Sequence, residues 1–370
     1  MARIRGLKLP RVPKGIGIMS RLPGGVEDRL SDLEGVRDNP GGLRARFYVP
    51  EGLKPGAGLV VVLHGCTQNA AAYDHGSGWS GLADRHGFGL LFPEQSRSNN
   101  PNLCFNWFNP EDVTRGRGEA ASIKAMVDRM IEAHGVDPGR VFVTGLSAGG
   151  AMAAAMLATY PDVFAGGAII AGVAYGCASG VAEAFDCMAG GGSGNARSLA
   201  ANVRRASGHK GPWPRVQIWQ GSGDRTVVPS NADALVRQWR ELHDLPARPS
   251  RSGREGGHEH LVWTAADGTA LVEHYTIAGM GHGTPLDPGE GEGQSGAAGA
   301  HMLDVGLSST NRIGEFFGIA GAAASNVVKE AEPARVRKAS ARDGKAKAKP
   351  VSSGVQATIE QALRAAGLMR

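Results

Sequence analysis

The length and composition of the chain exclude several classes of protein. Its 370 residues are 42% hydrophobic and 20% charged, a balance that supports a globular domain with a sizeable core and excludes a chain that is disordered throughout. No apolar run of the sequence approaches the roughly 18 residues that a membrane-spanning helix needs. The 56 glycines follow no collagen-like period, which excludes a fibre.

The formal charge of +5 is unevenly distributed. Residues 1–24 carry six basic side chains and no acidic one, and residues 329–370 carry ten basic against four acidic ones. Basic ends on an acidic body are suited to contact with an anionic or granule surface; the alternative is that both ends are simply solvated. Apart from charge, the sequence has no nucleic-acid-binding motif, so no specific nucleic-acid partner is expected.

The cysteines leave the compartment open. Cys66, Cys104, Cys177 and Cys187 form no CxxC pair and no metal-finger spacing, so no metal is expected. Their even number suits disulfides in an oxidising compartment. The first residues, MARIRGLKLPRVPKG, contain no apolar segment of the kind found in secretory signals. Two alternatives therefore remain: an extracellular protein with disulfides, or an intracellular protein with free thiols.

Short apolar runs predict the buried strands of a parallel sheet. They are continuous rather than alternating, as expected where helices cover both faces of a sheet. The runs lie at residues 59–65, 87–93, 140–145, 165–173, 215–221 and 271–279. Helical patterns separate them, among them residues 119–134, with apolar side chains at helical spacing, and a segment after Pro229 with Ser230 as N-cap. The alternation predicts one doubly wound α/β domain.

Four parts are predicted along the chain. Residues 1–44 form a basic arm and a lead-in, and residues 45–318 form the α/β domain. From residue 319 to about 353 the composition is small, polar and basic, which predicts a flexible linker. Residues 354–370 place apolar side chains on one face and predict a short amphipathic helix, which is marginal in water by itself.

Ser147 lies on a predicted bend between a strand and a helix. The segment VFVTGLSAGG, residues 141–150, matches the G-x-S-x-G pattern, in which tiny flanking residues let the strand and the helix approach each other closely. The bend exposes the hydroxyl at the start of a helix, whose free N–H groups favour developing negative charge. We predict Ser147 as a nucleophile; the alternative is an ordinary glycine-rich turn.

A serine nucleophile needs a base, and an acid to orient that base. In this fold the acid and the histidine follow the serine along the chain, each on a loop after a later strand. Asp224 follows the strand at 215–221 and His282 follows the strand at 271–279. We therefore predict Asp224 as the orienting acid and His282 as the base.

Other acids and histidines fit these roles less well. Asp233 falls inside a predicted helix, and Asp267 fits an Asp-Gly turn. His258 and His260 lie in a polar segment that reads as a loop with no strand before it. A metal pair is an alternative for these two histidines, but solvated side chains are expected.

The last predicted component is an oxyanion hole made of two backbone N–H groups. Ala148, directly after the nucleophile, supplies one. Cys66, in the loop after the strand at 59–65, supplies the other. His64 in the same loop precedes the serine in sequence, so we predict that it bonds the loop rather than acts as a base.

Several segments match one family of esterases. They include HGCTQ at 64–68, GEAASI at 118–123, GLSAGG at 145–150 and WQGSGDRTVVP at 219–229. Over about residues 45–318 the chain resembles the catalytic domain of the polyhydroxybutyrate depolymerase family, which is itself similar to feruloyl and acetylxylan esterases. The resemblance implies an α/β-hydrolase fold with the same three catalytic residues and oxyanion amides. It also implies disulfides between Cys66 and Cys104 and between Cys177 and Cys187, and an extracellular location; a granule-associated cytoplasmic enzyme is the alternative.

The expected reaction is ester hydrolysis through an acyl-enzyme, with no cofactor. A short-chain polyhydroxyalkanoate depolymerase or oligomer hydrolase is the first prediction, and a feruloyl or acetylxylan esterase is the alternative. A non-catalytic surface-binding protein is a third hypothesis, which the complete set of catalytic residues argues against. Secreted members of the family usually add a polymer-binding domain, which the short tail here does not resemble. Trp79, Trp107 and Trp219 are candidates to line the ester cleft, with core packing as the alternative for each.

Overall fold

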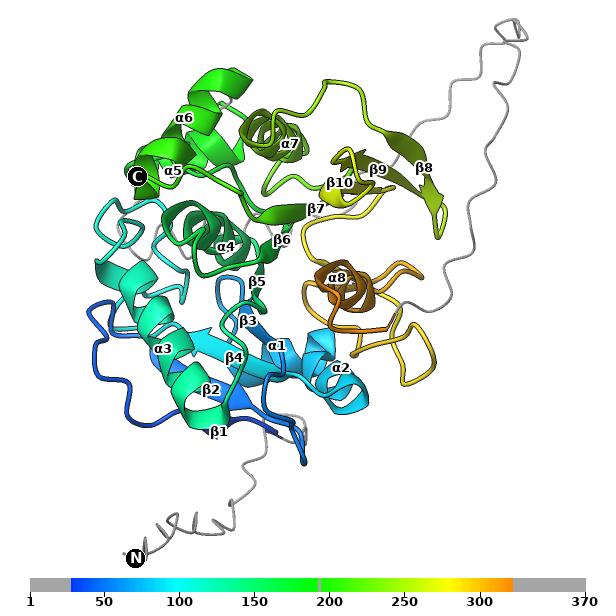
Figure 1. The fold of residues 1–370 in the computed structure, drawn as a ribbon. Helices are drawn as coiled ribbons and strands as arrows, with labels where there is room; N and C mark the ends of the chain where they lie inside the picture. Colours follow the sequence, from blue (N-terminus) through cyan, green and yellow to red (C-terminus); the bar gives the residue numbers. More distant parts are fainter. Residues whose placement is uncertain (1–27, 192–193, 322–370) are drawn as a thin grey trace, which may run out of the picture.

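In the part of the chain that the structure describes, a ten-stranded sheet forms the centre of the fold, as Figure 1 shows. The computed structural model describes residues 28–191 and 194–321. The predicted arm up to residue 27, the linker beyond residue 321 and the predicted helix at 354–370 lie outside these residues. Along the sheet the strands follow the order β1-β2-β4-β3-β5-β6-β7-β10-β9-β8.

The predicted strands form the middle of this sheet. They are β3 (Leu59–Leu63), β4 (Gly89–Glu94), β5 (Val141–Leu146), β6 (Gly166–Ile170), β7 (Arg215–Gly221) and β10 (Ala270–Ile277). Neighbours among them pair in parallel. All residues of β3, β5 and β6 are buried, because helices cover both faces, and this explains their continuous apolar sequences. The predicted α/β architecture with a mostly parallel sheet is confirmed.

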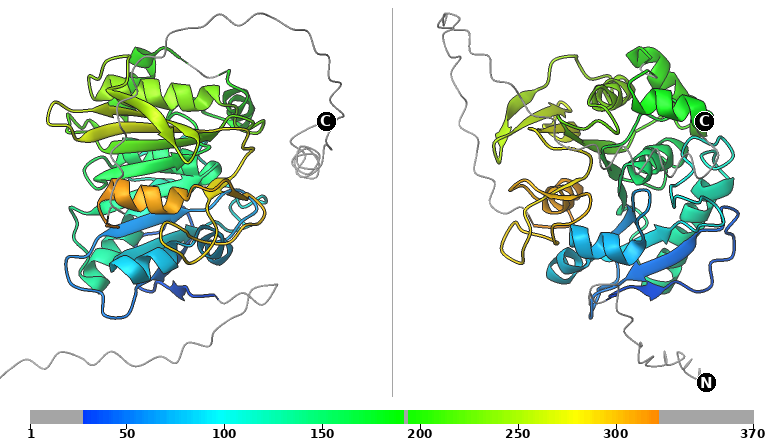
Figure 2. Two further views of the ribbon diagram at one scale, coloured as in Figure 1. Left: turned by 90° about the vertical axis from the view of Figure 1, so that its right-hand side faces the viewer. Right: turned by 180° about the vertical axis from the view of Figure 1, so that it is seen from behind.

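Two layers of helices bury the opposite faces of the sheet (Figure 2). One layer contains α3 (Gly118–His134), α4 (Ala148–Thr159), α6 (Ala196–Ser207) and α7 (Ser230–Leu242), and the other contains α1 (Ala70–Ser77), α2 (Trp79–His86) and α8 (Ser309–Phe317). Strand β3 contributes to both cores because its side chains alternate. Leu59, Val61 and Leu63 belong to the first core, and Val60 and Val62 belong to the second.

Strands at the margins of the fold were not predicted. They are β1 (Ser31–Asp32), β2 (Arg44–Tyr48), β8 (Arg251–Glu255), β9 (His258–Thr264), β11 (Thr284–Leu286) and β12 (Met302–Asp304). β2 pairs antiparallel with β4, and β1 with β2, so residues before residue 45 also belong to the sheet. Helix α7 starts at Ser230 itself, and Pro229 occupies the N-cap position that was predicted for Ser230.

The prediction of a polar loop around His258 and His260 is wrong, because both lie on β9, which pairs with β8 and β10. The His258 ring accepts a hydrogen bond from the Ala278 amide at 3.2 Å and bonds the Val305 carbonyl at 3.1 Å. The His260 ring stacks on Tyr275, with centroids 3.9 Å apart. These rings therefore pack against the protein. The sequence did not predict β9 because the polar residues on its exposed face interrupt the apolar pattern.

Candidate active site

Parallel strands end at one edge of the sheet, and three of them are followed there by a predicted catalytic residue. β5 leads directly into Ser147, β7 into the loop with Asp224, and β10 into the loop with His282. β6 separates β5 from β7, and β10 adjoins β7. Since the carboxyl ends of neighbouring parallel strands share one edge, the fold brings these three segments to the same edge of the sheet.

The backbone of Ser147 has the strained conformation that the sequence pattern predicts. Its φ of 57° and ψ of −116° lie where few residues other than glycine are found. Two hydrogen bonds hold the bend: the Ser147 amide donates to the Ile170 carbonyl at 2.9 Å, and the Ala151 amide donates to the Ser147 carbonyl at 2.8 Å. Helix α4 begins at Ala148, so Ser147 occupies the turn between β5 and this helix.

Glycines beside Ser147 allow α4 to lie against the sheet. A Cβ on Gly145 would lie 2.5 Å from the backbone of Gly149. A Cβ on Gly149 would overlap the carbonyl oxygens of Leu63 and His64 at the end of β3, and one on Gly150 would lie 2.8 Å from the Ile170 carbonyl. These obstacles are backbone atoms, which cannot rotate away. The close approach therefore needs the absence of side chains.

Gly149→Ala is expected to lower the free energy of unfolding by about 3 kcal/mol, because the new methyl group forces the start of α4 away from β3. Urea denaturation of the purified variant measures the change. Gly81→Ala in α2 is the matched control, because the nearest atom to its new Cβ is an arginine nitrogen 3.7 Å away, and alanine favours a helix interior. A Gly149→Ala protein as stable as the wild type would contradict the close approach.

Asp224 and His282 are hydrogen-bonded to each other. Asp224 Oδ2 lies 2.7 Å from His282 Nδ1, and the Asp224 side chain is fully buried. Its other oxygen accepts hydrogen bonds from the amides of Thr226 and Val227 at 2.8 and 3.0 Å. Because a carboxylate only accepts, the bond places the ring hydrogen on Nδ1. Nε2 of His282 is then the nitrogen that can take a proton.

His301 is a neighbour of the predicted base, and no motif in the sequence indicates it. Its Nδ1 lies 3.0 Å from the His282 carbonyl oxygen, and the two rings lie 6.0 Å apart. His301 has a φ of 60° and directly precedes β12, which pairs with the β11 strand that follows His282. This pairing of short strands carries no pattern in the sequence, so no signal there connects the two histidines.

A small pocket of about 30 Å³ lies beside Ser147. Its walls are mostly apolar and come from six different segments of the chain. The lining residues are Cys66, Trp107, Ser147, Ala148, Ala151, Val173, Met188 and Val227. The pocket thus brings together the predicted nucleophile, both predicted oxyanion residues and one of the three candidate tryptophans.

The backbone amides of Cys66 and Ala148 are available to a ligand. Ala148 is the first residue of α4, where N–H groups have no partner within the helix. Among the described residues, neither amide donates to a protein acceptor. His64 bonds the same loop, as predicted: its Nδ1 lies 2.8 Å from the Gly65 carbonyl, and Nε2 accepts from the Gln95 amide at 3.2 Å.

Two disulfides border the pocket, and their pairing confirms the prediction. Cys66 is bonded to Cys104, and Cys177 to Cys187. The first bond ties the loop that carries a predicted oxyanion amide to the segment that carries Trp107. The second joins α5 (Val181–Met188) to the chain after β6, next to the apolar cluster of Ala151, Val173 and Val227. Both crosslinks therefore support the walls of the pocket.

Trp79 and Trp219 lie in the core, away from this pocket. Trp79 is 2% exposed and Trp219 is fully buried. The Trp219 ring stacks on Tyr275, with centroids 3.9 Å apart, and its Nε1 donates to Gln217 at 2.8 Å. For Trp79 and Trp219 the structure therefore agrees with the alternative, core packing. Only Trp107 of the three lines the pocket.

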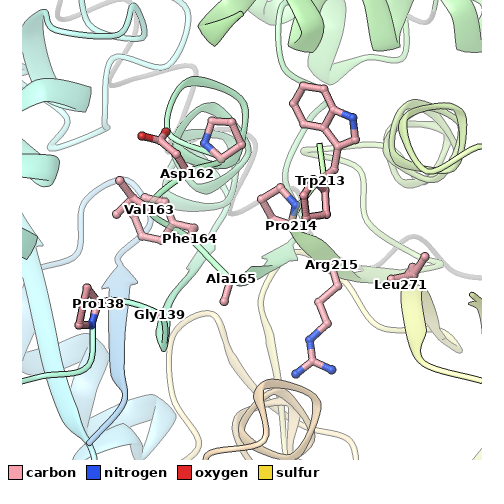
Figure 3. Close-up of a pocket in the computed structure, with 12 residues that line it drawn as sticks. Pro138, Gly139, Asp162, Val163, Phe164, Ala165, Trp213, Pro214, Arg215 and Leu271 are labelled. Carbon is pink, nitrogen blue, oxygen red and sulfur yellow. The ribbon is translucent and has the colours of Figure 1, made fainter. Parts of the chain in front are cut away.

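A larger cavity, of about 350 Å³, lies at the other edge of the sheet, and Figure 3 shows the side chains that line it. Pro138 and Gly139 precede β5, Ala165 precedes β6, and Arg215 begins β7, so the cavity lies where these strands start. Ser147 follows the end of β5. The larger cavity is therefore separate from the predicted catalytic groups.

Within residues 28–191 and 194–321, no helix is long and apolar enough to cross a bilayer. The same residues contain no group of three or more histidine, cysteine, aspartate or glutamate side chains placed to hold a metal ion.

Comparison with known proteins agrees with this geometry. Residues 44–259 match the family model described as esterase PHB depolymerase. The chain is 51% identical to poly(3-hydroxyalkanoate) depolymerase C of Paucimonas lemoignei over 79% of its own length and 70% of that protein. It is 34% identical to an acetylxylan esterase of Coprinopsis cinerea, over 70% of each chain.

A solved structure has the same overall architecture. The acetyl xylan esterase from Aspergillus awamori superimposes with a TM-score of 0.67 at 26% identity, over 79% of this chain and 99% of that one. These relatives are ester hydrolases, and the family match covers more than half of the chain. The chain belongs to the esterase PHB depolymerase family and is an ester-hydrolysing enzyme.

Proposed function

We propose that this enzyme hydrolyses short-chain poly(3-hydroxyalkanoates) or their oligomers, with Ser147 as nucleophile, His282 as base and Asp224 as orienting acid. The observation that carries the proposal is the hydrogen-bonded Asp224–His282 pair at the same sheet edge as the strained Ser147. The relative with 51% identity is named as a poly(3-hydroxyalkanoate) depolymerase, which supports the choice of polyester.

The proposed reaction has two halves. Ser147 Oγ attacks the ester carbonyl carbon while its proton passes to Nε2 of His282, and the amides of Cys66 and Ala148 hold the oxygen that becomes negative. The tetrahedral intermediate collapses, and the departing alcohol takes the proton from His282. Water then attacks the acyl-enzyme by the same route and releases the acid. Asp224 keeps the ring hydrogen on Nδ1 throughout.

The size of the pocket supports a short acyl substituent. It measures about 30 Å³, and Ala151, Val173, Met188 and Val227 are among the residues that line it. An acetyl group would fit the same space, which agrees with the structural likeness to an acetyl xylan esterase. Acetylxylan is therefore the second candidate substrate, whereas a bulky feruloyl group suits this pocket less well.

Substrate competition tests the proposal. The purified enzyme is incubated with amorphous poly(3-hydroxybutyrate) and, separately, with acetylated and feruloylated xylan, and the released acids are quantified. Ser147→Ala protein supplies the blank for each substrate. We expect 3-hydroxybutyrate and its oligomers as the main products. Release of acetate or ferulate without release of 3-hydroxybutyrate would contradict the polyester assignment and leave the esterase mechanism in place.

Met188→Ala is expected to widen the acyl preference. The main-chain carbonyl of Met188 accepts hydrogen bonds from the Val228 amide and from Asn231 Nδ2, both at 3.0 Å, so the side chain is held against the pocket. Its shortening should raise kcat/KM for p-nitrophenyl octanoate relative to the butyrate about tenfold. Val163→Ala, in the larger cavity at the other edge, is the control and should leave the ratio unchanged. An unchanged ratio in Met188→Ala would exclude this wall from acyl selection.

We also propose an extracellular location, which the two disulfides support, since such bonds persist in oxidising compartments. The predicted contact of the basic tail with a granule or anionic surface concerns residues outside the described part of the chain.

A further inference from the structure

Glu119 is a buried acid that the proposed reaction does not use. It lies in the first turn of α3 and has no exposed surface. Burial raises the pKa of its carboxyl group to about 8, and hydrogen bonds from Asn106 and Gln95 act in the opposite direction. Among the described residues, no lysine, arginine or histidine forms an ion pair with it. Such a group costs free energy of folding unless hydrogen bonds compensate for its burial.

The carboxyl group of Glu119 instead receives hydrogen bonds from two loops. Asn106 donates twice, from its backbone amide to Oε2 at 2.9 Å and from its side-chain Nδ2 to Oε1 at 2.8 Å. Gln95, which follows β4, donates from Nε2 to Oε1 at 2.6 Å. Asn106 is the residue before Trp107, so these bonds hold the backbone that carries one wall of the pocket.

Gln95 extends the network to the predicted oxyanion loop. The side-chain Nε2 of Gln95 also donates to the Cys104 carbonyl at 3.0 Å. The backbone amide of Gln95 donates to Nε2 of His64 at 3.2 Å. Cys104 is in turn bonded to Cys66. The segments after β3 and β4 and the segment at 104–107 therefore meet around a single carboxyl group.

We propose that Glu119 is a positioning residue, which sets the place of the Cys66 amide and of Trp107 against Ser147. This inference rests on the proposed role of Ser147 and its pocket. Glu119 does not touch the substrate. Its loss lets the 104–107 segment move away from α3, and the oxyanion amide moves with it through the Cys66–Cys104 bond.

The test compares Glu119→Ala and Glu119→Gln with Ser122→Ala, which is the matched control. Ser122 is equally buried on the same helix, but its hydroxyl accepts from the Gly41 amide at 2.8 Å, on the side of the lead-in rather than the pocket. With p-nitrophenyl butyrate, Glu119→Ala should lose about 10- to 100-fold in kcat, because a small displacement of catalytic groups has this effect. Glu119→Gln keeps an accepting oxygen and should lose less. Ser122→Ala should keep the wild-type kcat at equal folded fraction.

A second readout does not depend on turnover. Reduction of each disulfide by dithiothreitol is followed by thiol labelling and peptide mass spectrometry. Both Glu119 variants should speed reduction of Cys66–Cys104 while Cys177–Cys187, which Glu119 does not contact, serves as the internal reference. If Ser147→Ala kept its activity, the proposed function would fail, yet this readout would still report on the loop.

Two results would overturn the inference. One is a loss of kcat in Ser122→Ala equal to that in the Glu119 variants, and the other is an unchanged ratio of the two reduction rates. If Glu119→Ala does not fold, the kcat of Glu119→Gln and the ratio of its two disulfide reduction rates test the inference instead. Failure of both Glu119 variants to fold while Ser122→Ala folds would assign Glu119 to the stability of the domain and likewise reject a positioning role.

Discussion

Ser147→Ala is expected to lower kcat/KM for p-nitrophenyl butyrate about ten-thousand- to million-fold, because no acyl-enzyme can form without the hydroxyl. The fold should persist, since the hydrogen bonds that hold the bend are made by the backbone of this residue. Initial rates measured at high enzyme concentration give the residual activity. A fluorophosphonate probe followed by peptide mass spectrometry should label Ser147 in the wild type and nothing in the variant.

Ser252→Ala is the control for this experiment, because Ser252 lies exposed on β8, at the far margin of the sheet. It should retain full activity and full labelling. Substantial turnover by Ser147→Ala, or labelling of another serine in the wild type, would remove the basis of the proposed mechanism.

Asp224→Asn is expected to lower kcat about ten-thousand-fold while leaving the melting temperature close to that of the wild type. Asparagine keeps an oxygen for the amides of Thr226 and Val227, so the loop retains its shape. Its NH₂ group, however, faces Nδ1 of His282 and favours the tautomer with the hydrogen on Nε2, which cannot accept the proton of Ser147. Steady-state rates and thermal unfolding, measured on the same preparation, separate the two effects.

Asp267→Asn is the matched control for Asp224→Asn. Asp267 lies in the exposed turn between β9 and β10, where its carboxylate accepts from the Thr269 amide at 2.9 Å. This variant should keep the wild-type kcat. A wild-type rate in Asp224→Asn would show that another acid orients the base. A comparable loss in both variants would show that the effect is not specific to Asp224.

The central strands and the order of the catalytic residues could be predicted because both depend on local sequence. A strand buried on both faces is apolar at every position, as in β3, and the bend at Ser147 needs small residues on either side of one serine. Asp224 and His282 could be assigned because residues that follow parallel strands gather at one edge of the sheet. The hydrogen bond between these two residues agrees with that assignment.

The remaining features depend on contacts between distant segments. β8 and β9 are half-exposed. Polar residues therefore interrupt the apolar ones along both strands, and the two sequences resemble loops. Trp79 and Trp219 are buried because other elements of the fold pack over them. The local sequence around a tryptophan does not show whether it lies in the core or lines a cleft. His301 is hydrogen-bonded to His282, 19 positions away, and Glu119 to Asn106, 13 positions away. No spacing rule in the sequence indicates such pairs.

The bond between Cys66 and Cys104 has a practical consequence for making the enzyme. Because it fastens the loop on which the proposed oxyanion contact depends, protein produced in a host cytosol rich in glutathione should accumulate with its fold complete but its specific activity low. Treatment with an oxidised thiol buffer after purification should then recover the activity without any refolding step.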